Sequence, residues 1–135
     1  MGMFDSLNVS ATGMTASQLW MDVVSSNLAN ADSTKSASGG PYRRKEVVLS
    51  EASPSFGEVL GGVKVDGIVD DPSPPKMVYD PGNPEADKQG YVAMPNVNPV
   101  TEMVDLISAS RGYESNVTAM NAAKQMFSKT FDVLR

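Results

Sequence analysis

The last quarter of the chain carries the pattern that most constrains its fold. After Pro99 the sequence contains no further Pro and a single Gly, Gly112. Apolar and small residues recur there at alternating spacings of three and four, which is typical of a helix that buries one stripe along a partner helix. The stripe consists of Met103, Leu106, Ser110, Tyr113, Val117, Met120, Lys124, Phe127, Phe131 and Leu134.

The start of this helix is marked by three residues. Asn98 is a good N-cap, Pro99 fits the first helical position, and Glu102 places a carboxylate in the first turn. A helix from Pro99 to Leu134 would be about 50 Å long at 1.5 Å per residue. That length exceeds a compact small domain. Gly112 weakens such a helix, and we suggest that it permits close approach by a neighbouring helix.

The N-terminal segment repeats the pattern. From Phe4 to Asn30 it contains no Pro and one Gly, Gly13. Its stripe consists of Leu7, Ser10, Met14, Ser17, Met21, Val24 and Leu28. The sequence therefore predicts a second helix that pairs with the first along one seam, and the apolar members of both stripes are predicted to carry helix packing and assembly.

Each helix also has a second apolar set, which one seam cannot bury. These sets are Val9, Ala16, Leu19, Trp20 and Val23 in the first helix, and Val104, Ile107, Ala119, Ala122, Ala123 and Met126 in the second. Large apolar patches are rarely left in water, so the second sets favour self-assembly or packing with neighbouring chains. The alternative is that the middle of the chain folds back over them.

The middle differs in composition. Residues 35–99 hold all nine Pro and most of the Gly. Two segments, KEVVLSE and GVKVDGIVDD, are predicted strands of a small β-hairpin, whereas DPSPPKMVYDPGNPEADKQG is predicted to be extended loop. We therefore expect a mainly α fold with a small β-containing middle, divided into residues 1–34, 35–98 and 99–135.

Composition disfavours an enzyme. The chain has no Cys and no His, which removes thiolate chemistry, the commonest general base and the commonest metal ligand. The acidic loop of Asp80, Glu85 and Asp87 lacks the spacing of a Ca²⁺-binding EF-hand, so these are interpreted as solvated turn residues. No catalytic, cofactor or metal site is expected.

Charge and hydropathy limit the other classes. A formal charge of -5 opposes binding to nucleic acid. No run of apolar residues is long enough for a membrane span. The N-terminus lacks the basic and apolar regions of a secretory signal. The only tight basic cluster is Arg43, Arg44 and Lys45, which we expect to pair with acidic groups rather than with phosphate.

Two segments resemble the signatures of bacterial flagellar axial proteins, the rod, hook and hook-associated group. SSNLANADSTKS is similar to their pattern NNxANxxT followed by Gly-Tyr-Arg, and EMVDLISASRGYESNVTAMNAAKQMFSKTFDVL to their C-terminal signature. Ser26 replaces the first Asn, and KSASGGP is inserted before Tyr42. The matching residues are Asn27, Ala29, Asn30, Thr34, Tyr42, Arg43, Glu102, Arg111, Tyr113, Glu114 and Asn116.

This resemblance implies a non-enzymatic subunit of the basal-body rod. The two terminal helices would form an antiparallel coiled coil in the inner tube of a helical assembly, with the middle as a small outer domain. The short middle is similar to the proximal rod, which joins the MS ring to the distal rod and transmits torque. Implied partners are further copies, the rod proteins FlgB, FlgF and FlgG, FliE, the MS-ring protein FliF and the flagellar export apparatus.

The resemblance also implies a location and a role for the joint. The rod crosses the periplasm, and its subunits are exported without a cleavable signal peptide. KSASGGP is expected to turn the chain away from the tube, and Arg43, Arg44 and Lys45 to meet acidic groups of adjacent subunits. The alternatives are a soluble adaptor whose helical hairpin docks one partner, or a metal-dependent enzyme that uses the acidic loop.

Overall fold

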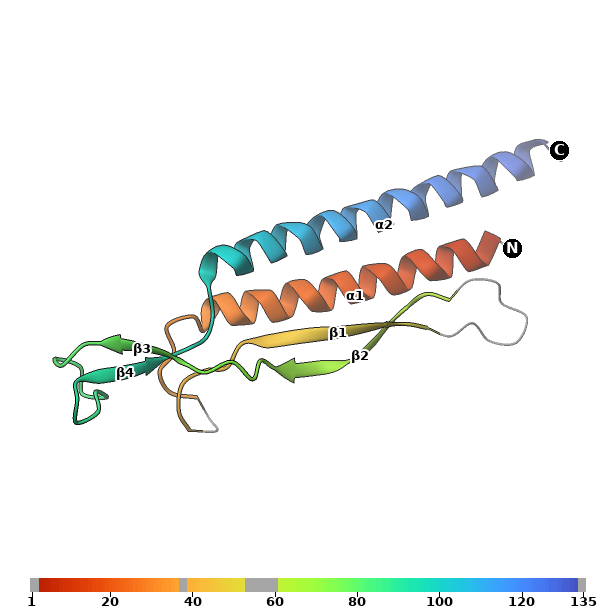
Figure 1. Ribbon diagram of the computed structural model, residues 1–135. Helices are drawn as coiled ribbons and strands as arrows, with labels where there is room; N and C mark the ends of the chain where they lie inside the picture. Colours follow the sequence, from red (N-terminus) through yellow and green to blue (C-terminus); the bar gives the residue numbers. More distant parts are fainter. Residues whose placement is uncertain (1–2, 37–38, 53–60, 134–135) are drawn as a thin grey trace.

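Two long helices flank a pair of small β-hairpins. The computed structural model describes residues 3–36, 39–52 and 61–133. Helix α1 spans Met3–Ala29 and helix α2 spans Pro99–Val133. Between them lie strands β1 (Lys45–Glu51), β2 (Val63–Asp70), β3 (Lys76–Tyr79) and β4 (Tyr91–Met94). Figure 1 shows the helices side by side, with the hairpins along and beyond one end of the pair.

The two helices run antiparallel, so both termini lie at the same end of the molecule (Figure 1). Near that end the rings of Phe4 and Phe127 stand edge to face with their centroids 6.1 Å apart. At the opposite end Asn27 is hydrogen-bonded to Glu102. The antiparallel pairing of the terminal helices is therefore present, while their supercoiling stays a prediction.

The predicted start of α2 is confirmed. The Val100 amide donates to Asn98 Oδ1 at 3.0 Å, and the Glu102 amide donates to the Asn98 carbonyl at 3.0 Å. Asn98 is thus the N-cap, with Pro99 at the first helical position. Phe131 lies within the helix backbone, whereas Leu134 lies outside the described residues.

The contact face of α2 differs from the predicted stripe by one residue in one of its two rows. The row of Leu106, Tyr113, Met120 and Phe127 is half-buried, as predicted. In the other predicted row, Ser110 and Val117 are half-buried, but Met103 is 52% exposed and Lys124 is exposed. The place of this row is taken by Glu102, Ala109, Asn116 and Ala123, of which all but the half-buried Asn116 are buried.

Helix α1 shows the same one-residue displacement. Only one of its two predicted rows is displaced: Leu7, Met14, Met21 and Leu28 are half-buried, whereas Gly13 and Asn27 beside them are buried. In the other predicted row, Ser10 and Val24 are buried and Ser17 is half-buried. Small side chains on the contact face let the two backbones approach closely. The spacing analysis favoured the larger apolar residues beside them, which is why the row was misplaced.

Glycines mark the closest approach of the helices. A Cβ on Gly13 would lie 2.8 Å from Asn116 Nδ2, and one on Gly112 would lie 3.3 Å from Ser17 Oγ. The helix that Gly112 admits is therefore α1 of its own chain.

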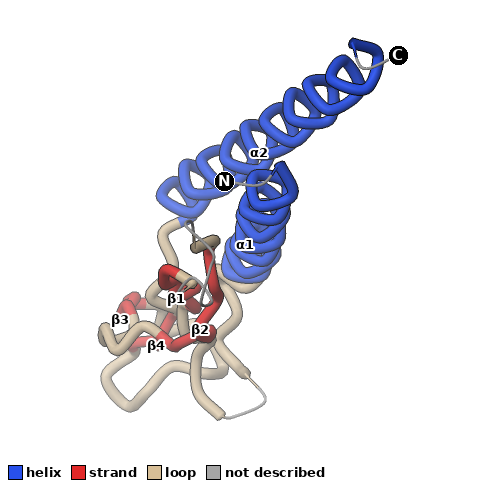
Figure 2. The backbone as a smooth tube through the Cα atoms, turned by 90° about the vertical axis from the view of Figure 1, so that its right-hand side faces the viewer, coloured by secondary structure: helices blue, strands red, loops and turns tan. Residues whose placement is uncertain are grey.

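The first hairpin packs on α1. Strands β1 and β2 are antiparallel from Lys45↔Asp70 to Glu51↔Val63, with a register shift between Val48 and Leu49. Both strands contact α1, and the Val63 amide donates to the Thr12 hydroxyl at 3.2 Å. The hairpin predicted from KEVVLSE and GVKVDGIVDD is confirmed. It covers a flank of α1 and leaves large apolar residues of α2 exposed. Figure 2 shows α2 set apart from the strands.

A second hairpin lies in the region predicted to be loop. Strands β3 and β4 pair antiparallel from Lys76↔Met94 to Tyr79↔Tyr91. The loop prediction for residues 71–90 was therefore wrong for β3, because four residues next to Pro74-Pro75 carry too little alternation to register as a strand. The connecting turn is closed by Asp87, whose Oδ1 accepts hydrogen bonds from the amides of Gln89 and Tyr91. In the described part of the chain, neither helix is long and apolar enough to cross a bilayer.

Candidate functional site at the joint between helices and strands

Asn27, in the last turn of α1, is the centre of a buried polar cluster. Its side chain is fully buried and makes four hydrogen bonds. The Nδ2 group donates to the Lys45 carbonyl at 2.8 Å and to Glu102 Oε2 at 2.9 Å. The Oδ1 atom accepts from the Lys45 amide at 2.9 Å and from the Tyr42 hydroxyl at 3.0 Å. All four hydrogen-bonding positions of the amide are thus occupied, two of them by the backbone that begins β1.

Glu102 brings α2 to the same point. It lies in the first turn of α2, where the helix dipole favours a carboxylate, and its side chain is fully buried. Oε2 accepts from Asn27, and Oε1 accepts from Arg44 Nε at 2.5 Å. A buried carboxylate is tolerated only when it is paired and hydrogen-bonded, and here both oxygens have a donor.

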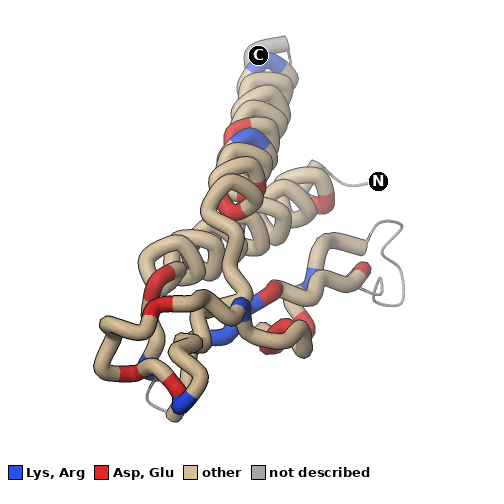
Figure 3. Tube along the Cα trace, turned by 60° about the vertical axis from the view of Figure 1, so that its left-hand side comes forward, with Lys and Arg blue, Asp and Glu red and all other residues tan. Residues whose placement is uncertain are grey.

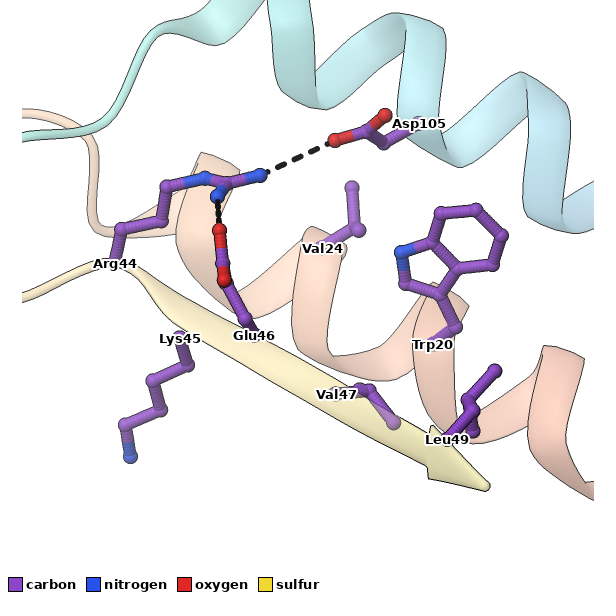
Figure 4. A pocket seen from close by; sticks show the side chains of 8 residues that line it. All are labelled: Trp20, Val24, Arg44, Lys45, Glu46, Val47, Leu49 and Asp105. Carbon is purple, nitrogen blue, oxygen red and sulfur yellow. Dashed lines mark hydrogen bonds and ion pairs between the residues drawn. The ribbon is translucent and has the colours of Figure 1, made fainter. Parts of the chain in front are cut away.

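Arg44 connects the strand entry to α2. Besides Glu102, its guanidinium pairs with Glu46 and with Asp105, the latter at 3.2 Å. Figure 4 shows the guanidinium between these two carboxylates, beside α1. Partial burial acts to lower the pKa of Arg44, but Glu102, Glu46 and Asp105 outweigh it and raise the pKa above its usual value.

The backbone of Arg44 is also held. Its amide donates to Asn96 Oδ1 at 2.9 Å, and its carbonyl accepts from the Asp71 amide at 2.8 Å. Asn96 lies just before α2 and Asp71 just after β2. We call Asn27, Tyr42, Arg44 and Glu102 the joint cluster, because these four residues tie α1, β1 and α2 together.

The chain leaves α1 through a second set of polar contacts. Asn30 Nδ2 donates to the Ser26 carbonyl at 2.9 Å, and the Asn30 amide donates to the same carbonyl at 3.1 Å, so Asn30 closes the end of the helix with two hydrogen bonds. The Tyr42 amide donates to the Ser33 carbonyl at 3.0 Å, so the segment returns to the helix end before entering β1. Part of KSASGGP, residues 37–38, lies outside the described residues.

An exposed ion pair links the joint to the second hairpin. Lys35 Nζ lies 2.8 Å from Glu85 Oε1. Hydrogen bonds from Lys35 and Thr34 lower the pKa of Glu85, and Glu85 raises the pKa of Lys35. Glu85 of the acidic loop therefore has a partner within the chain. Among the described residues there is no group of three or more acidic side chains that could hold a metal ion.

The structure separates the predicted basic cluster. We expected Arg43, Arg44 and Lys45 to meet acidic groups of adjacent subunits. Arg44 instead binds three carboxylates of its own chain, because its side chain points to the start of α2. Arg43 and the side chain of Lys45 are exposed, and for them the expectation stays a prediction. Figure 3 shows that charged residues are sparse along α1 and more frequent in the strands and loops.

Some of the residues matched by the two signatures come together at the joint cluster, and others lie elsewhere in the molecule. Asn27, Tyr42 and Glu102 belong to the joint cluster, Asn30 lies just after α1, and Thr34 interacts with Glu85 of the second hairpin. Tyr113 and Asn116 lie on the contact face of α2, far from the joint. The remaining matched residues, Ala29, Arg43, Arg111 and Glu114, are exposed.

Three members of the network were missed by sequence reasoning, namely Glu46, Asn96 and Asp105. Local signals exist for two of them: Asp105 follows Glu102 at a spacing of three and so shares its helix face, and Glu46 follows its partner Arg44 at a spacing of two, which places both on one face of an extended segment. Asn96 has no such signal, because its partner Arg44 lies in a distant part of the chain.

A groove opens next to the joint cluster. It has a volume of about 340 Å³, and its floor is formed by Trp20 and Val24 of α1 with Val47 and Leu49 of β1. Arg44 and Asp105 close one end, as Figure 4 shows. The site thus combines a fully satisfied polar joint with an open apolar surface, an arrangement suited to holding elements together rather than to acid–base chemistry.

The comparisons with known proteins agree with this interpretation. Residues 7–35 match the family model for flagella basal body rod protein, and residues 88–133 match that for the C-terminal region of the flagellar basal body rod FlgEFG proteins. The flagellar basal-body rod protein FlgC of Bacillus subtilis (strain 168) is 50% identical over 145 residues, covering 96% of this chain and 97% of its own. The chain belongs to the FlgC family.

Further FlgC proteins are similar over nearly the whole chain. That of Borreliella burgdorferi is 43% identical, covering 100% of this chain and 99% of its own, and that of Escherichia coli O6:H1 is 46% identical, covering 96% of each. FlgC proteins are structural rod proteins of the flagellar basal body and not enzymes, which confirms the family expected from the two signatures and a structural role in the rod. The joint cluster connects both matched regions, since Asn27 lies in the first region and Glu102 in the second.

Proposed function

We propose that the chain is a subunit of the proximal rod, where it polymerises into a helical drive shaft that transmits torque from the MS ring to the distal rod and hook. In this proposal α1 and α2 line the inner tube and the hairpins face outward. The neighbours are further copies, FlgB, FlgF, FlgG, FliE and the MS-ring protein FliF. The rod crosses the periplasm, and the subunit reaches it through the flagellar export apparatus.

The observation that carries this proposal is the exposed apolar surface of α2. Val100, Met103, Val104 and Ile107 are 70%, 52%, 57% and 53% exposed, at the spacing i, i+3, i+4, i+7 of one helix face. Met126, at 62%, lies farther along the same helix. A long helix that leaves large side chains in water on one face, while another face packs on α1, is suited to contacts with neighbouring subunits.

A single substitution on this face tests the proposal. Ile107→Asp places a charge in the expected contact between subunits, so rod assembly and swimming should be lost in a bacterium whose own copy is deleted. Because Ile107 is half exposed in the single chain, the purified subunit should keep its helicity and melting temperature. Ile107→Leu is the matched control and should restore motility.

The proposal fails if Ile107→Asp supports normal swimming and rods of normal length. It also fails if the purified protein forms only a closed complex of fixed stoichiometry with its partners in sedimentation, because a drive-shaft subunit must form an open assembly.

A further inference from the structure

The contact face of α2 repeats itself every seven residues. One row consists of Glu102, Ala109, Asn116 and Ala123 and is called the small row after its two alanines; the large row consists of Leu106, Tyr113, Met120 and Phe127. If α2 moved along α1 by one heptad, Ala109 would take the place of Glu102 and Tyr113 that of Leu106. Small residues would again lie in the small row and large residues in the large row. Apolar packing alone therefore discriminates weakly between the two registers.

The lengths of the helices permit such a shift in one direction. Helix α2 has 35 residues and α1 has 27, so α2 is longer by about one heptad. Sliding that brings Ala109 opposite Asn27 would still cover α1. Sliding in the other direction would draw Pro95 and Pro99 into the helix interior, where proline is not tolerated. One competing register therefore exists.

The joint cluster distinguishes these two registers. In the observed register, Ser17 lies at Gly112 and Asn27 at Glu102, so ten residues along α1 correspond to ten along α2. In the shifted register, Ala109 would face Asn27 Nδ2 and Arg44 Nε. Asn27 Nδ2 would keep only the Lys45 carbonyl, and Arg44 would keep only Glu46, because Asp105 would move away with Glu102. Losing hydrogen bonds at a buried site is costly, whereas the observed register makes them all.

We propose that Glu102 sets the register of the antiparallel helix pair through its hydrogen bonds with Asn27 of α1 and with Arg44, the residue just before β1. A buried polar residue that fixes the register of paired helices is a known use of such groups. Because Arg44 belongs to the strand entry, the same residue fixes where the hairpins sit along the helices. The proposal concerns the single chain and does not rest on rod assembly.

Disulfide cross-linking tests this proposal on the full-length protein, since the natural chain has no Cys. A Cβ on Gly112 would lie 3.3 Å from Ser17 Oγ, so Ser17→Cys with Gly112→Cys places two thiols within reach in the observed register. Ser17→Cys with Ala119→Cys reports the shifted register. In an otherwise unchanged chain, we expect at least a tenfold higher yield for the first pair.

The deciding variant moves the carboxylate by one heptad. Glu102→Ala combined with Ala109→Glu should reverse the preference, so that the pair at residues 17 and 119 cross-links and the pair at 17 and 112 does not. Glu114→Ala, at an exposed position of α2, is the matched control and should leave the preference unchanged.

Spin labels give a second measurement that does not require a bond. Labels at Gln18 and Lys124, both exposed, should come closer by several Å in the carboxylate-swapped variant, because one heptad moves α2 by about 10 Å along the axis. A swapped variant that keeps the original distance and the original cross-link overturns the proposal. So does a swapped variant that fails to fold, since a carboxylate at position 109 is expected to restore the cluster.

Discussion

The side-chain amide of Asn27 donates to the Glu102 carboxylate at 2.9 Å across 75 residues of sequence. The two residues come from the two terminal segments that carry the family signatures, and both are fully buried. Glu102 receives its second donor from Arg44, at the entry to the hairpins. One point in the molecule therefore connects both helices to the outer strands, and its residues are the natural targets for mutation.

Replacement of Asn27 by Ala should destabilise the subunit. The Lys45 amide and carbonyl and one oxygen of Glu102 would each lose a hydrogen-bond partner. A buried polar group left unsatisfied costs about 1–3 kcal/mol, so the free energy of unfolding should fall by about 3 kcal/mol. Urea denaturation followed by circular dichroism measures this. Asn8→Ala, at an exposed position of the same helix, should change the stability by less than about 0.5 kcal/mol.

Arg44 and its neighbour Arg43 should respond differently to the same change. Arg44→Met leaves the fully buried Glu102 without its cation, and breaking such a pair costs about 3–5 kcal/mol. Arg43→Met removes an exposed charge and should alter stability by less than about 0.5 kcal/mol. Thermal melts of the purified variants compare them directly. Equal effects of the two substitutions would contradict a stabilising ion pair between Arg44 and Glu102 within the subunit.

A separate prediction concerns the role of the exposed cations, Arg43 and Lys45, in assembly. Charge reversal at Arg43 and Lys45, as Arg43→Glu with Lys45→Glu, should weaken rod assembly and leave the melting temperature of the isolated subunit nearly unchanged. Counting intact rods by electron microscopy of isolated basal bodies measures the first effect. A fall in the melting temperature with normal rods would show that these side chains act within the subunit.

Gly13 should be less tolerant of a methyl group than its helix propensity suggests. Ala is favoured over Gly by about 1 kcal/mol in a helix interior. A Cβ at Gly13, however, would lie 2.8 Å from Asn116 Nδ2, and that group already donates to the Gly112 carbonyl at 3.0 Å. We expect Gly13→Ala to destabilise the protein by about 1 kcal/mol, because the Asn116 side chain must move away from the new methyl group and from its hydrogen bond to Gly112.

A double-mutant cycle separates the two effects at Gly13. In an Asn116→Ala background the obstruction is gone, so Gly13→Ala should stabilise the protein by up to about 1 kcal/mol. Chemical denaturation of the four proteins gives the coupling energy. Additive effects would mean that the two side chains do not meet.

The Glu85 carboxyl should titrate below its usual range. Hydrogen bonds from Lys35 and Thr34 lower its pKa in the folded protein. The ion pair therefore contributes to stability above the pKa of the unfolded chain, and the contribution is lost as the pH falls through the lower, folded value. NMR titration of the Glu85 side chain measures the midpoint. Lys35→Met should move it upward, and Lys88→Met, at an exposed position of the same loop, should not.

The helices and the first hairpin could be predicted from the sequence because each carries a local signal. Asn98 and Pro99 mark the start of α2, and the apolar runs around Val47 and Val65 mark β1 and β2. The β3 strand was missed because its four residues owe their conformation to the partner β4, which is not a local property.

The joint cluster could be predicted only as a set of residues. The signatures singled out Asn27, Tyr42 and Glu102, yet no spacing in the sequence indicates that they touch. The sequence also does not predict that the Arg44 side chain points toward α2, since an arginine beside two other cations is ordinarily interpreted as a solvated surface group. Contacts between distant segments depend on how the helices and strands pack, which the one-dimensional pattern does not contain.

The small row on the contact face of α2 has a consequence for how this subunit divides its hydrophobic free energy. Ala109 and Ala123 are buried within the single chain, whereas Val100, Val104 and Met126 are exposed to water. Each of these larger side chains is worth about 1.5–3 kcal/mol when fully buried. If the subunit assembles as proposed, these side chains would leave water only on contact with neighbouring chains, so the assembled rod would be held together by apolar contacts that the isolated subunit lacks.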